Sequence, residues 1–263
     1  MSTHRHAHTA PVKRGERGRA ERRLRMTPNR RTALITGAAQ GIGWACAQHF
    51  LREGWSVVGW DTRPRNDARI QWGRVDVSDW DAVASAAEKL PPLAAAVHCA
   101  AIATRSPIIK TAKEEWDRVI AVNLNAVFYV ARWLFRPLRQ GRGVLVNLAS
   151  INATNTFANR AAYSCAKAAV LSFTQTLAVE WGPAGIRAFA VSPGFTLTEM
   201  TLEAIRAGAI DEKRVKAFTP QRRMLTPAAV ARAIVCLVGD DFSGLTGNNV
   251  LIDCGFDAWG GRF

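Results

Sequence analysis

From residue 31 onward, short apolar runs alternate with longer amphipathic stretches, and this alternation restricts the fold more than any other feature. We predict strands over residues 31–36, 56–60, 71–75, 94–98, 144–148, 187–191 and 249–252. Most of these runs are apolar throughout, which is typical of strands buried on both faces of a parallel sheet. The stretches between them predict helices over residues 42–53, 79–90, 112–135, 160–181 and 227–238. The sequence therefore predicts an α/β fold, with one doubly wound sheet of about seven parallel strands flanked by helices.

The N-terminal segment has a different composition. Residues 1–31 contain ten arginines or lysines and two glutamates, which accounts for +8 of the net charge of +14. Because this segment is so basic and so poor in large apolar side chains, we predict a disordered basic tail over residues 1–30 and one folded domain over residues 31–263. The tail has no aromatic side chain to stack on bases, so we do not expect nucleic acid as a partner.

Composition also argues against several classes of protein. No apolar run approaches the roughly 20 residues that span a bilayer, and no apolar stretch follows the basic N-terminus as in a secretory signal. We therefore expect a cytoplasmic protein without a membrane partner. The five cysteines form no Cys-x-x-Cys pair, so we expect them to be reduced and buried, and we expect no metal site.

A glycine-rich loop follows the first predicted strand and opens the first predicted helix. It reads Thr-Gly-Ala-Ala-Gln-Gly-Ile-Gly over residues 36–43. Glycines allow a tight turn and let backbone N–H groups approach a pyrophosphate, and the helix N-terminus adds partial positive charge. The candidate phosphate-binding residues are Gly37, Gln40, Gly41, Ile42 and Gly43.

Carboxylates at the ends of the next two strands complete a nucleotide-binding pattern. Asp61 ends the second strand, where it can accept hydrogen bonds from the adenosine ribose diol and would repel a 2′-phosphate. Arg63 and Arg65 follow and could screen a phosphate, but Gln40 stands where an arginine would favour NADP. We therefore expect NAD, with NADP as the alternative. Asp76 follows the third strand and could bind the adenine amino group, with Val77 packing on the ring.

Tyr163 and Lys167 are the strongest candidates for catalysis. Their spacing places them one turn apart on one face of a helix. A free tyrosine, with a pKa of about 10, is a poor base at neutral pH, but a nearby ammonium favours the phenolate. Ser150 follows a predicted strand at the sheet edge, where its hydroxyl can bind a substrate oxygen. Asn123 lies within a long predicted helix, where asparagine is not a favoured residue.

Together these residues resemble the short-chain dehydrogenase/reductase family over about residues 30–255. The resemblance implies a Rossmann-like fold, and Asn123, Ser150, Tyr163 and Lys167 match the family's catalytic tetrad. It further implies that Lys167 bonds the nicotinamide ribose and that Asn123 holds a water that relays protons to Lys167. A segment typical of the family's nicotinamide site adds four cofactor-binding candidates, Pro193, Gly194, Thr196 and Thr198. By the same likeness we expect a homotetramer.

One segment departs from the family pattern. Where the family usually has Asn-Asn-Ala-Gly after the fourth strand, this chain has His98, Cys99, Ala100 and Ala101. Ala100 keeps a small residue where the backbone lines the adenine ribose. Ala101 would be strained by about 1 kcal/mol if the backbone there requires a positive φ. We interpret His98 as a buried strand residue and not as a catalyst.

The residues between the nicotinamide segment and the last helix are expected to form a lid over the substrate. The lid contains Arg206, Lys213, Arg214 and Lys216, which would either meet an anionic substrate or form a solvated helix face. Four residues after Ser150 could also line the pocket, namely Asn152, Asn155, Phe157 and Asn159.

The sequence thus predicts an NAD(H)-dependent oxidoreductase that moves a hydride between the nicotinamide and an alcohol or carbonyl, with Tyr163 as the general acid/base. Two alternatives remain at this point. One is an NADPH-dependent 3-oxoacyl-carrier-protein reductase on the same fold. The other is a cofactor-binding regulator without catalysis. The substrate is a small molecule whose identity the sequence leaves open.

Overall fold

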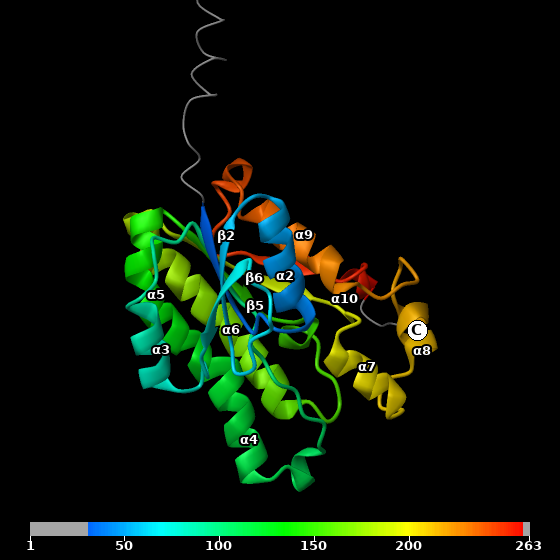
Figure 1. The fold of residues 1–263 in the computed structure, drawn as a ribbon. Helices are drawn as coiled ribbons and strands as arrows, with labels where there is room; N and C mark the ends of the chain where they lie inside the picture. The colour runs from blue at the N-terminus through cyan, green and yellow to red at the C-terminus, as the bar shows by residue number, and fades with distance from the viewer. Residues whose placement is uncertain (1–30, 260–263) are drawn as a thin grey trace, which may run out of the picture. The chain divides into compact units, whose positions relative to one another are not determined.

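A sheet of seven parallel strands forms the centre of residues 31–259, the part of the chain that the computed structural model describes (Figure 1). The strand order is β3-β2-β1-β4-β5-β6-β7. The strands are β1 (Thr32–Thr36), β2 (Ser56–Asp61), β3 (Ile70–Arg74), β4 (Ala95–His98), β5 (Val144–Leu148), β6 (Arg187–Pro193) and β7 (Asn249–Ile252). This confirms the predicted doubly wound α/β fold. The predicted disordered tail over residues 1–30 lies outside the described residues.

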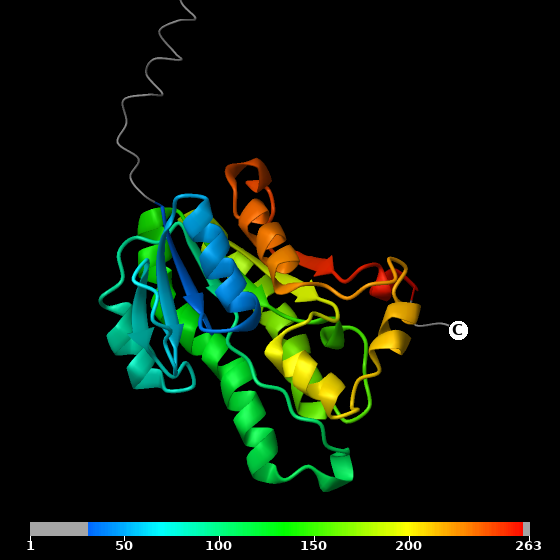
Figure 2. The same ribbon diagram turned by 45° about the vertical axis from the view of Figure 1, so that its right-hand side comes forward.

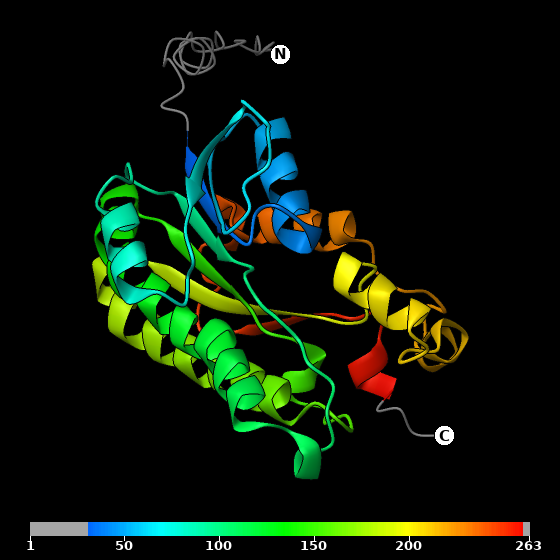
Figure 3. The same ribbon diagram turned by 60° about the horizontal axis from the view of Figure 1, so that its bottom comes forward.

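Helices cover both faces of the sheet (Figures 1 and 3). One face packs against α2 (Gly41–Arg52) and α9 (Pro227–Leu237), and the other against α3 (Trp80–Ala87), α5 (Ala126–Gly141) and α6 (Ala161–Trp181). Each face has its own apolar cluster, so every central strand is buried on both sides. This burial explains why the strand sequences are continuously apolar.

Strand β1 illustrates how one run supplies both clusters. Ala33 and Ile35 belong to the cluster under α2 and α9, whereas Leu34 belongs to the cluster under α3, α5 and α6. All three side chains are fully buried. Successive side chains of a strand point to opposite faces, so each apolar residue contributes to one of the two cores.

The long helix expected over residues 112–135 differs from the prediction. It consists of α4 (Lys113–Ile120), a π-helical turn (Ala121–Asn125) and α5, which continues through Pro137 to Gly141. A proline usually ends a helix, but Pro137 and Leu138 are buried, and the Pro137 carbonyl accepts a hydrogen bond from Leu93 N at 2.9 Å. Packing therefore stabilises the helix past the point where the sequence alone predicts its end.

The continuous helix over residues 113–141 is long and apolar enough to cross a membrane by length and composition alone. Its buried residues include Val130, Leu134 and Leu138, which pack in the core against the sheet. The helix is therefore a core helix of the α/β domain.

Side-chain caps begin two of the helices as the sequence indicates. The Asp79 carboxylate accepts hydrogen bonds from the backbone N–H groups of Asp81 and Ala82, both at 3.0 Å, at the start of α3. Thr226 caps α9 through Ala229 N at 3.2 Å, and Pro227 occupies the first turn. Each cap satisfies backbone donors that otherwise lack a partner in the helix.

Three short helices were not predicted. They are α7 (Glu199–Arg206), α8 (Glu212–Phe218) and α10 (Phe256–Trp259). Helices α7 and α8 lie on the same side of the domain, within the segment expected to form a lid (Figure 2). Their short length gives too little apolar periodicity to separate them from loops.

Two cysteines contradict the expectation that all five are buried. Cys46 and Cys254 are buried, but Cys165 and Cys236 are exposed. Helix α6 buries Ala162, Ala166 and Val170, and this places Cys165 on another face of the helix.

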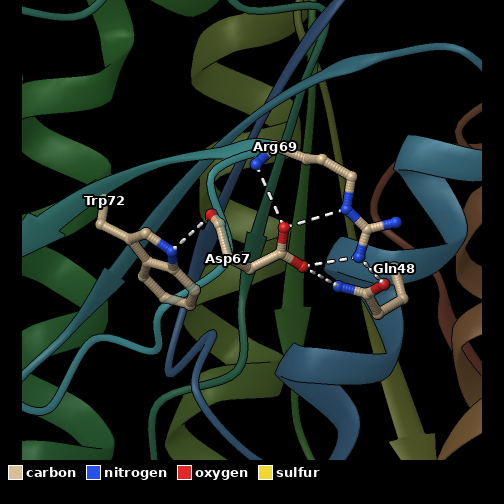
Figure 4. A network of polar contacts seen from close by, with 4 residues as sticks. All are labelled: Gln48, Asp67, Arg69 and Trp72. Carbon is tan, nitrogen blue, oxygen red and sulfur yellow. Dashed lines mark hydrogen bonds and ion pairs between the residues drawn. The ribbon is translucent and has the colours of Figure 1, made fainter.

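Polar contacts hold the loop between β2 and β3 against α2 (Figure 4). Arg69 donates to the Asp67 carboxylate from Nε at 2.9 Å and Nη2 at 2.6 Å, and Gln48 Nε2 of α2 also donates to it at 3.1 Å. Trp72 Nε1 donates to the Asp67 carbonyl at 3.1 Å. These bonds hold the pKa of Asp67 well below its usual range, first through the Arg69 side chain. The network orders the loop that follows Asp61.

A row of polar side chains crosses the buried sheet at its carboxyl end. Thr36, His98 and Asn147 occupy paired positions on β1, β4 and β5. Thr36 Oγ1 and His98 Nδ1 lie 3.0 Å apart, and Asn147 Nδ2 donates to Thr174 Oγ1 at 3.0 Å. Burial, with a contribution from the Lys167 charge, lowers the pKa of His98 to about 3. His98 is therefore a neutral core residue, as the sequence suggested.

This burial predicts a specific acid sensitivity. Below pH 6.5 the unfolded chain binds a proton at His98 that the folded protein excludes, so stability falls as the pH drops toward 3. Between about pH 7 and about pH 4, the wild type should lose about 3 kcal/mol more of its free energy of unfolding than His98→Asn. Urea unfolding at each pH measures the difference. The control His49→Asn, at a partly exposed position, should follow the wild type; equal pH curves for wild type and His98→Asn would contradict the prediction.

Candidate active site

A cleft of about 530 Å³ lies at the carboxyl ends of the strands. In a parallel sheet these ends meet at one edge, and the loops that follow them form the binding crevice. With one exception, Asn123, every residue predicted from the sequence as catalytic or cofactor-binding lines this cleft. The structure thus brings together residues from Gly37 to Thr198.

The glycine-rich loop forms one wall of the cleft. Gly37 adopts a φ of 62°, and a Cβ there would lie 2.8 Å from Ala100 Cα. A Cβ on Gly43 would lie 2.1 Å from the Gly37 carbonyl oxygen. Helix α2 begins here with no side-chain cap on Gln40 and no acidic residue in its first turn. Its N–H groups are therefore available to an anion, which fits the pyrophosphate of a dinucleotide.

Asp61 lies at the end of the cleft that the sequence assigns to adenosine. Its carboxylate accepts hydrogen bonds from Ala39 N and Arg63 N, both at 3.0 Å. Arg63 lines the cleft, whereas Arg65 does not: its guanidinium donates to the Ala39 carbonyl and lies 4.5 Å from the Trp44 ring centroid. Of the two arginines that complicated the choice of cofactor, only Arg63 faces the site.

Asp76 and Val77 lie beside Asp61 on the cleft wall. The Asp76 carboxylate accepts hydrogen bonds from Ser78 N at 2.9 Å and Ser78 Oγ at 2.7 Å. Both hydrogen bonds are accepted by Oδ1 of the carboxylate, and neither involves Oδ2.

The segment after β4 has no backbone strain at Ala101. The residues with a positive φ, among those described, do not include Ala101. The side chain of Ala101 would be unfavourable only at a positive φ, which Ala101 does not adopt. The change from glycine is therefore tolerated.

Helix α6 carries Tyr163 and Lys167 into the cleft. The Lys167 side chain is 2% exposed, and its ammonium donates a hydrogen bond to the Leu148 carbonyl at 2.6 Å. Its Nζ lies 5.8 Å from the centroid of the Tyr163 ring. Burial lowers the pKa of Lys167 to about 8, so its proton is held much less tightly than in water.

Burial raises the pKa of Tyr163, because the phenolate loses solvation. The influences that lower it are a hydrogen bond with Ser150 and the charge of Arg160. The spacing of Tyr163 and Lys167 predicted that Lys167 lowers this pKa, but in the structure the lowering comes from Ser150 and Arg160. Ser150 lies just beyond β5 and also accepts a hydrogen bond from Asn152 N at 3.1 Å, which orients its hydroxyl within the cleft.

Asn123 lies in the π-helical turn, is fully buried and does not line the cleft. Its Oδ1 accepts from Ile102 N at 2.9 Å, and its Nδ2 donates to the Ile102 carbonyl at 2.8 Å. The side chain therefore fixes the chain segment after β4, which forms part of the cleft wall. Its role in holding a water stays a prediction.

Three arginines that line the cleft were not predicted from the sequence. They are Arg105, in the loop after β4, Arg118 of α4, and Arg160, just before α6. A sequence signal did exist for Arg160, because a cation at the start of a helix opposes the helix dipole. No comparable signal marked Arg105, whose loop has no regular structure.

The expected lid residues contribute less than predicted. The four basic residues of α7 and α8 do not line the cleft, and Lys216 pairs with Glu212 at 2.6 Å. They therefore form a solvated face. Of the four residues expected after Ser150, Asn152 alone lines the cleft.

The cleft's apolar wall includes Phe195, which packs with Phe157 and Phe256 at centroid distances of 5.9 and 5.6 Å. Asn155 hydrogen-bonds Asp257 instead of facing the cleft. The C-terminal helix α10 therefore helps to hold the loop after Ser150 in place.

Comparison with known proteins agrees with this geometry. Residues 37–257 match the family model described as enoyl-(acyl carrier protein) reductase. The 2-(R)-hydroxypropyl-CoM dehydrogenase of Xanthobacter autotrophicus is 33% identical over 87% of this chain and 99% of its own length. The NAD-dependent glycerol dehydrogenase of Listeria innocua is 33% identical over 86% of this chain and 93% of its own.

Among solved structures, ElxO with NADP bound superposes with a TM-score of 0.80 and 25% identity, over 87% of this chain and 99% of that one. The relatives' names therefore include both nicotinamide cofactors. The fold, the cleft and these matches lead to one conclusion: the chain belongs to the short-chain dehydrogenase/reductase family, and it is an oxidoreductase that acts on alcohol or carbonyl groups with a nicotinamide cofactor.

Proposed function

We propose that this protein is an NAD(H)-dependent alcohol dehydrogenase or ketoreductase in which Tyr163 is the general acid/base. The observation that supports the proposal is the convergence of Ser150, Tyr163 and Lys167 on one cleft whose other wall is the glycine-rich loop. A dinucleotide bound along that loop would place its reactive ring near these three side chains.

When bound, the nicotinamide accepts or supplies the hydride. In the oxidative direction, Tyr163 as phenolate removes the proton of the alcohol, and Ser150 steadies the substrate oxygen by hydrogen bonding. The hydrogen bond with Ser150 and the charge of Arg160 stabilise the phenolate, and the lowered pKa of Lys167 suits it to exchange protons near neutral pH. Reduction runs in reverse, with Tyr163 donating the proton.

The cofactor-binding residues in this proposal are those predicted from the sequence. The phosphates would lie against Gly37, Gln40, Gly41, Ile42 and Gly43, and the adenosine against Asp61, Asp76, Val77 and Ala100. The nicotinamide end would be held by Tyr163, Lys167, Pro193, Gly194, Thr196 and Thr198. Asn123 acts as a positioning residue through Ile102.

The preference for NAD rests on Asp61. A 2′-phosphate near this carboxylate would place like charges together in a partly buried site, which costs several kcal/mol. The hydrogen bonds from Ala39 N and Arg63 N hold the carboxylate in place, so it cannot easily turn away from the phosphate.

Removing the phenolic hydroxyl tests the role of Tyr163. Tyr163→Phe should lower kcat by about 10²–10⁴-fold while NADH still binds, because proton transfer is lost and the ring remains. Turnover with a panel of alcohols and NADH fluorescence titration measure the two effects. The matched control is Tyr129→Phe, on α5, which should keep wild-type turnover; retained turnover in Tyr163→Phe would refute the role.

Replacing the carboxylate of Asp61 tests the cofactor preference. Asp61→Ser should raise the ratio of kcat/KM for NADP to that for NAD by about 100-fold, because the repulsion disappears and Arg63 can face the phosphate. Asp241→Ser, at an exposed position outside the cleft, is the control and should leave the ratio unchanged. A wild-type protein that already prefers NADP would favour the alternative of a carrier-protein reductase.

The outer face of α5 and α6 supports the proposed homotetramer. Phe128 is 46% exposed and Val179 is 78% exposed, and Trp80 of α3 stacks on Phe128. Sedimentation velocity should give a tetramer for the wild type and smaller species for Phe128→Glu, because a charge would be buried at the interface. Arg139→Glu, at the end of α5, is the control; a monomeric wild type would contradict the proposal.

A further inference from the structure

Arg105 and Arg160 are two of the arginines that line the cleft containing Tyr163. Arg160 immediately precedes α6, and Arg105 lies in the loop after β4; both line the cleft together with Ser150 and Tyr163. The guanidinium carbon of Arg160 lies 5.8 Å from the centroid of the Tyr163 ring. A substrate whose hydroxyl reaches the phenol therefore lies close to Arg160, in a cleft that Arg105 also lines.

Neither arginine has an acidic partner. The ion pairs within residues 31–259 involve Arg31, Arg69, Lys113 and Lys216. Arg160 donates one hydrogen bond, from Nη1 to the Thr104 carbonyl at 3.3 Å, and no hydrogen bond involves the Arg105 side chain in the described part of the chain. A guanidinium has five N–H donors, so most donors of this pair are unused by the protein.

The surroundings of Arg160 disfavour its charge. Burial, and to a smaller extent the charge of Arg105, lower the pKa of Arg160 to about 10. Arg160 lies at the start of α6, a helix of 21 residues with no acidic residue in its first turn. The positive end of the helix adds to the repulsion. A bound anion would offset the unfavourable burial of the Arg160 charge, its repulsion by Arg105 and its repulsion by the positive end of the helix.

The acidic residues of the cleft lie elsewhere. Asp61 and Asp76 follow β2 and β3, on the side assigned to adenosine. Glu199, at the start of α7, lies near the glycine loop, with Oε2 3.6 Å from the position of a Cβ on Gly41. The region around Arg105 and Arg160 is therefore left with uncompensated positive charge.

We propose that Arg105 and Arg160 form an anion subsite, and that the substrate is an alcohol or ketone carrying an acid group, a hydroxy acid or oxo acid. The proposal rests on the proposed function and specifies its substrate class. The acid group accepts hydrogen bonds from the two guanidinium groups, whose planar arrays of donors match the oxygens of a carboxylate or sulfonate. The carbinol carbon then lies at Ser150 and Tyr163. Because Arg160 lies over the Tyr163 ring, the acid group and the hydroxyl are separated by a short chain.

A substrate panel provides the first test. Hydroxybutanoates and hydroxypentanoates, and the corresponding hydroxyalkanesulfonates, are compared with their neutral amides in NAD-dependent oxidation. The acids should have a KM at least about 10-fold lower than the amides, and the advantage should shrink as salt is added. The carboxylate and sulfonate series identify which oxoanion fits better. Equal KM values for acids and amides in both series would overturn the proposal.

Variants assign the effect to the two arginines. Arg160→Met and Arg105→Met should each raise the KM for the acids by about 10- to 100-fold, because each removes charge-assisted hydrogen bonds, and Arg160→Lys should recover part of the loss. The matched control is Arg139→Met, an exposed arginine at the end of α5, at the opposite edge of the sheet. It should leave every KM unchanged.

A binding measurement separates this proposal from the proposed function. Calorimetry measures the affinity of succinate, an unreactive dicarboxylate, for the enzyme–NADH complex. Wild-type protein should bind succinate at least about 10-fold more tightly than either methionine variant, and the variants should keep the NADH affinity of the wild type and a Tm no lower than that of the wild type. If succinate binds through the arginines but no alcohol is oxidised, the proposed function fails and the subsite stands. Equal succinate affinity in wild type and both variants would overturn the subsite.

Discussion

The parallel arrangement of the strands is the constraint on which the rest of this protein depends. Parallel strands cannot be joined by tight hairpins, so each connection crosses a face of the sheet, and the loops after the strands gather at one edge. Gly37, Asp61, Ser150 and Pro193 each follow or end a different strand and meet in one cleft. The cleft lies at this edge of the sheet.

The cleft combines groups that are individually unfavourable. Lys167 is an almost fully buried ammonium, held by the Leu148 carbonyl, and Arg160 is a partly buried guanidinium without an acidic partner. Such buried charges lower the free energy of unfolding of the free protein. Their lowered pKa values have the same cause, because burial disfavours the charged form of each group. The two apolar cores of the sheet offset this. The perturbed groups lie together at the edge where a ligand would bind, which is typical of functional sites.

Local patterns in the sequence predicted most of the fold. Strands buried on both faces, such as β1 and β5, are mostly apolar because both sides of the strand face a core. The residues Thr226 and Pro227 mark the start of α9. The end of α5 and the helices α7, α8 and α10 were not predicted. The continuation of α5 through Pro137 depends on contacts with Leu93, which lies far away in the sequence.

The sequence by itself determined the fold class, the glycine-rich loop, the carboxylate of Asp61 and the tyrosine–lysine pair, because each depends on strand periodicity, backbone freedom or spacing along one helix. The tertiary structure alone decided how these residues are tuned. It showed that Asn123 bonds Ile102, and that Ser150 and Arg160 act on the pKa of Tyr163. It also placed Arg105 and Arg160 in one cleft. These effects depend on burial and on distances between residues from separate loops, and no local pattern encodes either quantity.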